Sequence, residues 1–509
     1  NHQKGPLYSS SQPCLCVQPR VFLLLVRLLY RLLVLVRNSQ TLTSAGSTPS
    51  SKSLTRSRYA FPPLLKQVIA KDIDLSVTQV NNSNIVALVG TLFVRVLAGP
   101  ACDRFDPRLT FACSLLIGAV PTFLSGAATN AAEIYVIRFF TGILGGTFVP
   151  CQIWTTAFFD TNVVGTANAL TAGFGNAGGG VTYFVMPAIF AWLVDRDIAP
   201  RVAWRVTFIV PGVFIVVVAL LMLALCPDTP VGKWSDRAQA IESNAEQFHA
   251  SGASAHLRSK TSVGKKPSNA SSGHQSDAAR SEQNPSHLDY LILAQSEQIH
   301  PPTVKYFIRI WVSPQTIVTS ACYFCSFGPE LAINSILGDY FYDNFPSLGL
   351  QGSGAWAAMF GLMNVFFRPL GGVIADWAYR GTSSVWSKKF LLHVYGVLSG
   401  AFLIALGASK HDNLATMVGL INVGAGFFLE GGNGLDYSLV PHVHPRANGV
   451  VSGFTGACGN LGGIVFAIFI RYHGDDYDKS MWIIGVMVIA INVAVCWIKP
   501  TATSHIGKT

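Results

Sequence analysis

The chain has 509 residues, of which half are hydrophobic and 12% are charged, and its mean hydropathy is +0.40. A soluble domain carries about 25% charged residues, so this composition argues against a water-soluble enzyme and favours a membrane protein. We assign the net charge of +10 to basic loops at one membrane face and predict no nucleic-acid partner. The ten cysteines lack the paired spacing of metal ligands, so we predict no metal site and no cofactor.

Residues 1–58 form an atypical N-terminal extension. Its segment FLLLVRLLYRLLVLVR, at 22–37, is apolar but contains three arginines, and each would cost about 2.5–3.5 kcal/mol near the bilayer centre. An amphipathic helix on the membrane surface is one explanation, and a signal peptide fits less well because of the arginines. We favour a misassigned first exon, which would also explain why the first predicted span, at 59–70, is short.

Eleven further apolar runs are long enough to cross a bilayer, for which about 20 apolar residues suffice. A polar stretch at 227–310 separates them into two sets and predicts a loosely ordered loop. The chain therefore divides into a six-helix half at 59–226, this central loop, a second six-helix half at 311–500 and a tail at 501–509. The runs cover 84–101, 109–128, 133–153, 165–194, 204–226, 311–338, 354–375, 389–408, 413–434, 447–471 and 480–498.

Lysine and arginine in the connecting segments predict the orientation. Basic residues follow the second and eighth spans and fill the central loop, whereas the opposite loops carry mostly acidic residues. The loop after the fifth span is an exception, since it contains Arg196, Arg201 and Arg205. The balance places the central loop and both termini in the cytoplasm, where the loop's RSKTSVGKK stretch is a candidate site for a regulatory kinase.

Two motifs recur in the same order in both halves. RVLAGPACDR begins at Arg95 and RPLGGVIADW at Arg368, and in each the arginine precedes a glycine by four positions and an aspartate by eight. A glycine–asparagine cluster also recurs, around Asn176 in the fifth span and Asn460 in the eleventh. The repeat predicts an all-α membrane protein with two pseudo-symmetric six-helix halves. The other repeated positions are Asp103 with Asp376, and Gly175, Gly178 and Gly179 with Gly459, Gly462 and Gly463.

Arg95 and Arg368 are the main candidates for substrate binding. A charged residue inside a span is costly and therefore indicates a function, and neither arginine has an acidic residue three or four positions away. Two guanidiniums facing one cavity repel each other unless an anion lies between them, and a guanidinium binds a planar oxyanion in a bidentate manner that lysine cannot reproduce. Alternatively, each arginine pairs with a carboxylate from another helix, for which Glu330 and Glu430 are the main candidates.

Amide and aromatic side chains are predicted to complete the pocket. Asn176 and Asn460 can hydrogen-bond an anion without adding charge, or bond a neighbouring backbone instead. Tyr323 and Phe327 share a helix face because they lie four residues apart, and Phe148 lies among small residues in the fourth span. Ordinary packing is the alternative role for each ring.

Other polar residues are predicted to serve gating or structure. Asp103 and Arg104 belong to GPACDRFDPR, which resembles the loop signature of the major facilitator superfamily, where such residues form a cytoplasmic latch between helices. Asp376 is its counterpart in the second half. Arg138 lies near the membrane face at the start of the fourth span, and we assign it a structural, gating or proton-handling role.

Over roughly residues 59–500 the chain resembles the nitrate/nitrite porters of the major facilitator superfamily, most of all the fungal high-affinity type. AGFGNAGGGVTYFVMP and GFTGACGNLGGIVFAIFIR are similar to the two nitrate signatures of that family, and YAFPPLL and VPHVHPRANG also match. The resemblance implies twelve transmembrane helices, a plasma-membrane location and proton-coupled uptake. It also implies that Arg95 and Arg368 clamp the substrate, with Asn176, Asn460, Tyr323, Phe327 and, less firmly, Phe148 lining the pocket. The departure lies before residue 59, where TLTSAGSTPSSKSLTRSR replaces a full first helix.

We therefore predict an alternating-access transporter of nitrate and nitrite driven by proton symport. Two protons per nitrate would favour uptake into a negative-inside cell, because each charge moved against 100 mV costs about 2.3 kcal/mol. A nitrate/nitrite exchanger and a non-transporting nitrate sensor are the alternatives. No nucleophile–base or metal constellation is apparent, so we predict that the chain is not an enzyme.

Overall fold

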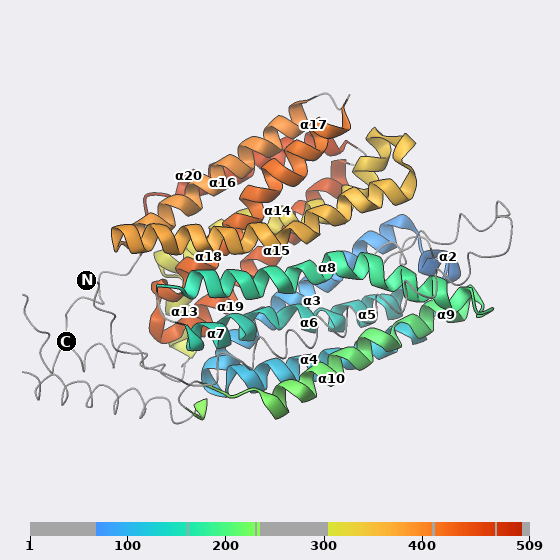
Figure 1. Cartoon of the computed structure of the whole chain (residues 1–509), viewed down its shortest axis with the longest axis horizontal. Coiled ribbons are helices and arrows are strands. Elements are labelled where there is room, and N and C mark those ends of the chain that lie inside the picture. Colours follow the sequence, from blue (N-terminus) through green and yellow to red (C-terminus); the bar gives the residue numbers. More distant parts are fainter. Residues whose placement is uncertain are drawn as a thin grey trace, which may run out of the picture.

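The computed structural model describes residues 68–159, 162–229, 232–234, 304–409, 413–473 and 476–500. These parts of the chain are mostly long helices that run roughly parallel or antiparallel to one another (Figure 1). The N-terminal half, blue to green in Figure 1, lies beside the C-terminal half, yellow to red. Within the described residues, nine helical stretches, some of them made of two or three consecutive helices, are long and apolar enough to cross a membrane.

The N-terminal half begins, within the described residues, at the short helix α2. A capping box starts α3: the Ser76 hydroxyl accepts from the Gln79 amide, and the Gln79 side chain accepts from the Ser76 amide. The predicted span at 133–153 is divided into three consecutive helices, α5 to α7. The helices are α2 (Ala70–Asp72), α3 (Val77–Arg104), α4 (Pro107–Leu124), α5 (Ala131–Thr141), α6 (Ile143–Gly146), α7 (Phe148–Phe158), α8 (Val164–Val194), α9 (Pro200–Thr207) and α10 (Ile209–Leu225).

The C-terminal half contains α15, which with 34 residues is the longest of the described helices. A π-helical segment, η6, joins α17 to α18, and α18 is buried along almost its whole length. The helices are α13 (Val304–Trp311), α14 (Pro314–Asn344), α15 (Gly349–Thr382), α16 (Val385–Ala408), α17 (Leu414–Val418), η6 (Gly419–Ala425), α18 (Gly426–Val443), α19 (Asn448–His473) and α20 (Tyr477–Val495).

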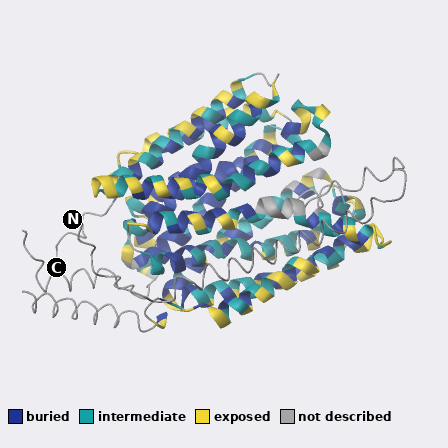
Figure 2. Cartoon of the chain, in the orientation of Figure 1, coloured by how far each residue is buried: buried dark blue, intermediate teal, exposed yellow. Residues whose placement is uncertain are grey.

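Apolar side chains cover both the interior and the outer face of this helix bundle. The faces between helices are buried, whereas many outward-facing positions are exposed (Figure 2). The exposed positions include large apolar residues such as Phe93, Leu220 and Val493. An outer surface of this kind suits lipid rather than water, and it supports a multi-pass membrane protein.

The two most extensive junctions between the halves are α3 packed along α19 and α15 packed along α8. Glycines allow the close approach in both pairs. A Cβ on Gly99 would lie 2.2 Å from the carbonyl oxygen of Gly449, and a Cβ on Gly372 would lie 2.5 Å from that of Gly165. Gly99 and Gly372 each follow the repeated arginine by four positions, and Gly165 and Gly449 each precede the repeated asparagine by eleven. The two junctions therefore follow the predicted pseudo-symmetry.

Several predicted segments lie wholly or mostly outside the described residues. They are the extension 1–58, most of the span at 59–70, most of the central loop with its candidate kinase site, and the tail 501–509. Within the predicted loop, α13 already begins at Val304, so the helical part of the second half starts earlier than residue 311.

Candidate functional site

Arg95 and Arg368 come from opposite halves and contact the same two aromatic rings. Arg95 of α3 is 4% exposed, and Arg368 of α15 is fully buried. The Arg95 guanidinium carbon lies 4.8 Å from the ring centroid of Phe148 and 5.2 Å from that of Phe327. The corresponding distances from Arg368 are 5.4 and 5.9 Å. The rings therefore receive two positive charges on their electron-rich faces.

The two guanidiniums differ in their hydrogen bonds. Arg95 donates from Nε to the carbonyl oxygen of Gly145 and from Nη1 to that of Gly456, both at 3.0 Å. Arg368 donates from Nη2 to the Tyr323 hydroxyl at 3.0 Å, while its Nε and Nη1 have no acceptor. Two donors of a buried guanidinium thus remain available to a ligand.

Direct ion pairing does not explain the two arginines in this structure. Among the described residues, no carboxylate oxygen lies within 4.0 Å of either guanidinium. Glu330 instead accepts from the side-chain amides of Asn364 and Asn433. Two buried cations without a bonded counter-ion are unfavourable, so the arrangement favours an anionic ligand.

The two predicted asparagines are placed differently. Asn460 is buried, and its Nδ2 donates at 3.1 Å to the Gly456 carbonyl, the same oxygen that accepts from Arg95. Asn176 of α8 is half-buried, and its Nδ2 has no acceptor within the described part of the chain. The structure therefore links Asn460 to Arg95 and leaves the Asn176 amide without such a link.

The repeated glycines also have different surroundings. In α19, a Cβ on Gly459 would lie 2.4 Å from the Tyr323 ring, and one on Gly462 would lie 2.5 Å from the Phe324 carbonyl oxygen. Gly463 likewise packs tightly against Leu331 of α14. These contacts hold α14 and its aromatic residues close to α19.

The glycines of α8 show no such packing. A Cβ on Gly175 or Gly178 would meet nothing within 4 Å. The surroundings of Gly179 lie outside what the structure describes. Similar sequence in the two halves therefore does not produce similar packing.

Asp103 and Asp376 each cap a helix of the opposite half. Asp103 accepts from the backbone amide of Val450 in α19 at 3.2 Å. Asp376 accepts from the backbone amide and the hydroxyl of Thr166 in α8, at 2.6 and 2.8 Å, and pairs with fully buried Lys388 at 3.0 Å. A carboxylate is favourable at these positions because it bonds free amides and faces the positive end of the helix dipole.

The other predicted basic residues lie away from the aromatic cluster, which consists of Phe148, Tyr323, Phe327 and Tyr437. Arg138 donates to the side-chain oxygen of Asn84 and so links α5 to α3. Arg104 is exposed, and its guanidinium lies over the ring of its neighbour Phe105. No described contact joins either residue to Arg95 or Arg368.

The sequence profile of the Major Facilitator Superfamily matches residues 55–467. The chain belongs to the Major Facilitator Superfamily. A solved structure of the proton:xylose symporter XylE with a bound sugar analogue has the same fold, with a TM-score of 0.55 and 15% identity over 84% of this chain and 88% of that one. The predicted fold class is confirmed, and the protein is a membrane carrier and not an enzyme.

Curated relatives of this transporter carry more than one substrate name. It is 39% identical to Elsinochrome transporter 1 of Elsinoe fawcettii, over 88% of this chain and 90% of the relative. It is 32% identical to High affinity nitrate transporter 2.5 of Arabidopsis thaliana, over 87% of this chain and 76% of the relative. It is 24% identical to Nitrate/nitrite transporter NrtP of Nostoc punctiforme, over 78% of this chain and 80% of the relative.

Tyr437 belongs to the transporter's aromatic cluster, although the sequence did not single it out. Its ring packs edge-on against Phe148 at 4.9 Å and Tyr323 at 5.0 Å, and its hydroxyl donates to the Ser452 carbonyl. It lies in the run EGGNGLDYS of α18, whose polar residues and glycines are unusual for a span. This unusual composition was the feature of the sequence that could have identified Tyr437 as a site residue.

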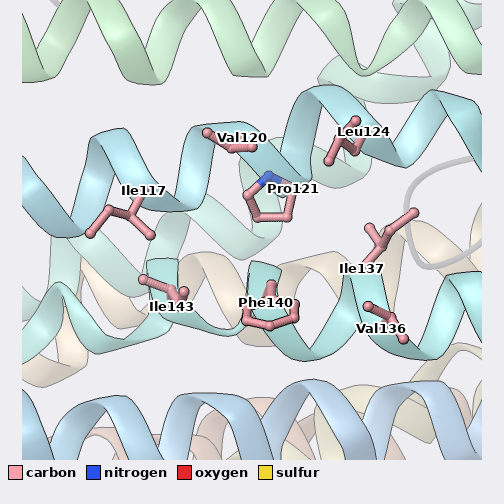
Figure 3. A pocket seen from close by; sticks show the side chains of 8 residues that line it. All are labelled: Ile117, Val120, Pro121, Leu124, Val136, Ile137, Phe140 and Ile143. Carbon is pink, nitrogen blue, oxygen red and sulfur yellow. The ribbon is translucent and has the colours of Figure 1, made fainter.

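An apolar groove on the outer face of the transporter does not suit an anion. It lies between α4 and α5–α6, and the side chains that line it are apolar (Figure 3). Several of them, such as Ile117 and Val136, are exposed on the lipid-facing surface. The lining residues are Ile117, Val120, Pro121, Leu124, Val136, Ile137, Phe140 and Ile143.

Proposed function

We propose that this transporter takes up nitrate, and nitrite as a second substrate, by proton symport across the plasma membrane. In this proposal both termini lie in the cytoplasm, at the same end of the bundle as Asp103. The observation that carries it is the pair of buried arginines, Arg95 and Arg368, which come from opposite halves and contact the same two rings.

The chemistry of the pair favours a small planar oxyanion. The Nε and Nη1 donors of Arg368 have no acceptor within the described residues, so both can donate to the oxygens of an anion in the guanidinium plane. The flat faces of Phe148 and Phe327 confine the space beside the arginines. Nitrate and nitrite present two or more coplanar oxygens to such donors, so both are suitable ligands.

Anion binding would also favour closure of the two halves. Each half contributes one arginine, so their mutual repulsion opposes close approach, and an anion between them removes it. At the Asp103 end, the junctions of Asp103 with α19 and of Asp376 with α8 hold the halves together. Opening these junctions and closing the opposite end would give alternating access, with the two aspartates as gate residues.

The relatives support anion transport without deciding the substrate. Relatives from a plant and a cyanobacterium are named nitrate transporters. The relative with 39% identity is named an elsinochrome transporter, so elsinochrome is a competing cargo. The unpaired arginines favour the anion. A nitrate/nitrite exchanger and a nitrate sensor would use the same clamp, and they differ in proton dependence and in flux.

The test measures nitrate uptake by the full-length chain in proteoliposomes, for the wild type and for Arg95→Lys and Arg368→Lys. Lysine keeps the charge and loses the planar fork, so we expect the apparent KM for nitrate to rise about 10- to 100-fold, the effect of losing one charged hydrogen bond or more. Arg201→Lys is the matched control, because this arginine is 74% exposed and distant from the pair.

Each outcome has a distinct meaning. Undiminished uptake by both lysine variants would contradict the clamp. Uptake of elsinochrome and not of nitrate would show that nitrate is not the substrate and that elsinochrome is. Nitrate flux that ignores a pH gradient would support an exchanger, and nitrate binding without flux would support a sensor.

A further inference from the structure

α18 carries two carboxyl groups that are buried inside a membrane-spanning segment without hydrogen-bond partners. Glu430 and Asp436 are both 0% exposed, and no donor reaches any of their four carboxyl oxygens. No described cation lies within 4.0 Å of them. An ionised carboxylate in such a place costs several kcal/mol, so both groups carry a proton in this conformation.

Glu330 of α14 is the contrasting case. Its Oε1 accepts from Asn364 at 2.8 Å and its Oε2 from Asn433 at 2.5 Å. Ser326 donates to the Asn433 oxygen at 2.7 Å, which fixes the orientation of that amide. An ionised carboxylate only accepts hydrogen bonds, and here both oxygens receive a donor. Of these three carboxyl groups, Glu330 is therefore the one whose negative charge the protein stabilises by hydrogen bonds.

Glu330 and Glu430 lie on two helices, α14 and α18, that pack together beside Arg368. Asn433, which donates to Glu330, follows Glu430 by about one helical turn in α18, and a Cβ on Gly434 would lie 2.1 Å from the backbone carbonyl oxygen of Arg368. Two neighbouring carboxyl groups in a low-dielectric site resist holding two negative charges, so the pair shares one proton. Because the asparagine amides stabilise the charge on Glu330, the proton resides on Glu430.

The resulting charge count matches a monovalent anion. Arg95 and Arg368 contribute two positive charges and Glu330 one negative charge, which leaves a single positive charge when Glu430 is protonated. Loss of the Glu430 proton would cancel that charge and weaken anion binding. Conversely, an anion at Arg368 neutralises the cation that would otherwise favour ionised Glu430. Proton and anion therefore bind cooperatively, as linkage requires.

We propose that Glu430 is the proton-carrying residue of this transporter. It holds its proton while the anion occupies the arginine pair, and after the anion leaves, the O–H bond breaks and the proton passes to water on the receiving side. This inference rests on the proposed anion transport. It concerns a proton and not a metal cation, because the oxygens of Glu330 are already used by amides.

Other titratable groups face α18 from the elements packed around it. Tyr395 of α16 packs on Phe427 and Phe428, and Lys388 of α16 contacts His442 near the end of α18. The titratable groups on the helices around α18 are Tyr323 and Glu330 of α14, Arg368 and Asp376 of α15, Lys388 and Tyr395 of α16, and Arg95 of α3, which lies near Tyr437. The other titratable groups of α18 itself are Asp436, Tyr437 and His442.

The experiment separates coupling from transport, using full-length protein in proteoliposomes. Nitrate accumulation driven by an inside-alkaline pH gradient is compared with nitrate counterflow in the absence of a gradient. We expect Glu430→Gln to lower gradient-driven accumulation about 10-fold or more and to keep counterflow within about 2-fold of wild type, since glutamine mimics the protonated acid permanently.

Three further variants serve as controls. Glu133→Gln makes the same chemical change at the exposed start of α5 and should behave as wild type in both assays. Glu430→Asp keeps a titratable group and should restore part of the gradient-driven accumulation. Asp436→Asn tests the other carboxyl group that has no partner.

The outcomes distinguish this assignment from the proposed function. Wild-type accumulation by Glu430→Gln would overturn the assignment, and so would loss of coupling in Asp436→Asn with normal coupling in Glu430→Gln. Loss of counterflow in both Glu430→Gln and Glu430→Asp would also overturn it, because Glu430 would then serve the fold or anion binding. Absence of nitrate counterflow in the folded wild type would overturn the anion-transport proposal itself.

Discussion

Asp376 of α15 accepts two hydrogen bonds from Thr166 of α8, at 2.6 Å from its backbone amide and 2.8 Å from its hydroxyl, and so joins the two halves of the transporter. The repeat-related residue, Asp103, makes the equivalent junction with Val450 at 3.2 Å. Asp376 also neutralises Lys388, whose side chain is fully buried. The two halves therefore share the geometry of this junction.

Asp376→Asn should strongly destabilise the protein. It leaves Lys388 buried without a counter-ion, which costs about 3–5 kcal/mol. The thermal midpoint of the detergent-purified protein measures the loss. Adding Lys388→Met to Asp376→Asn should recover much of it. An unchanged midpoint in Asp376→Asn, or no recovery in the double variant, would contradict this account.

The paired glycines predict opposite responses to one added methyl group. Gly459→Ala should destabilise the protein by about 1–3 kcal/mol, because its Cβ would overlap the Tyr323 ring. Gly175→Ala, the repeat-related change, should be neutral or stabilise α8 by up to about 1 kcal/mol, because its Cβ meets open space. Thermal midpoints of the two variants give the comparison, and a larger loss in Gly175→Ala would show that α8 packs more closely than the structure indicates.

Tyr323→Phe should impair anion binding more than Tyr437→Phe does. The first change removes the acceptor of Arg368 Nη2, a charged hydrogen bond worth about 1.5–3 kcal/mol, and the second removes a neutral bond to Ser452 worth about 0.5–1.5 kcal/mol. Both variants keep the ring, so packing is matched. The apparent KM for nitrate in counterflow should rise about 10- to 100-fold for the first and about 2- to 10-fold for the second. The reverse order would exclude this role for Tyr323.

Phe148→Leu should weaken nitrate binding at the two arginines. Leucine keeps an apolar side chain and removes the ring that both guanidiniums contact, and each such contact is worth about 0.5–2 kcal/mol. We expect a higher KM for nitrate with little change in the thermal midpoint. Phe105→Leu is the control, because its exposed ring lies against Arg104 and not against the arginine pair. An unchanged KM in Phe148→Leu would mean that the ring only fills space.

The fold class could be predicted from the sequence alone, and so could the internal repeat and the two arginines within apolar runs. Apolar runs of about 20 residues are visible locally, and a charge within one of them stands out because few side chains there are polar. The repeat identified Asp103 with Asp376 and Arg95 with Arg368 as equivalent positions, and the structure places both aspartates at equivalent junctions. Superfamily membership confirms the fold predicted from these patterns.

Contacts between side chains on different helices could not be predicted from the sequence. Tyr437 joins the cluster, and Asn364 and Asn433 hold Glu330 while Glu430 has no partner, because helices distant in sequence bring these groups together. Likewise Gly175 and Gly459 occupy the same place in the repeat, yet only Gly459 is pressed against a neighbour. Hydropathy and spacing depend on adjacent residues, whereas packing and charge compensation depend on residues brought close by folding.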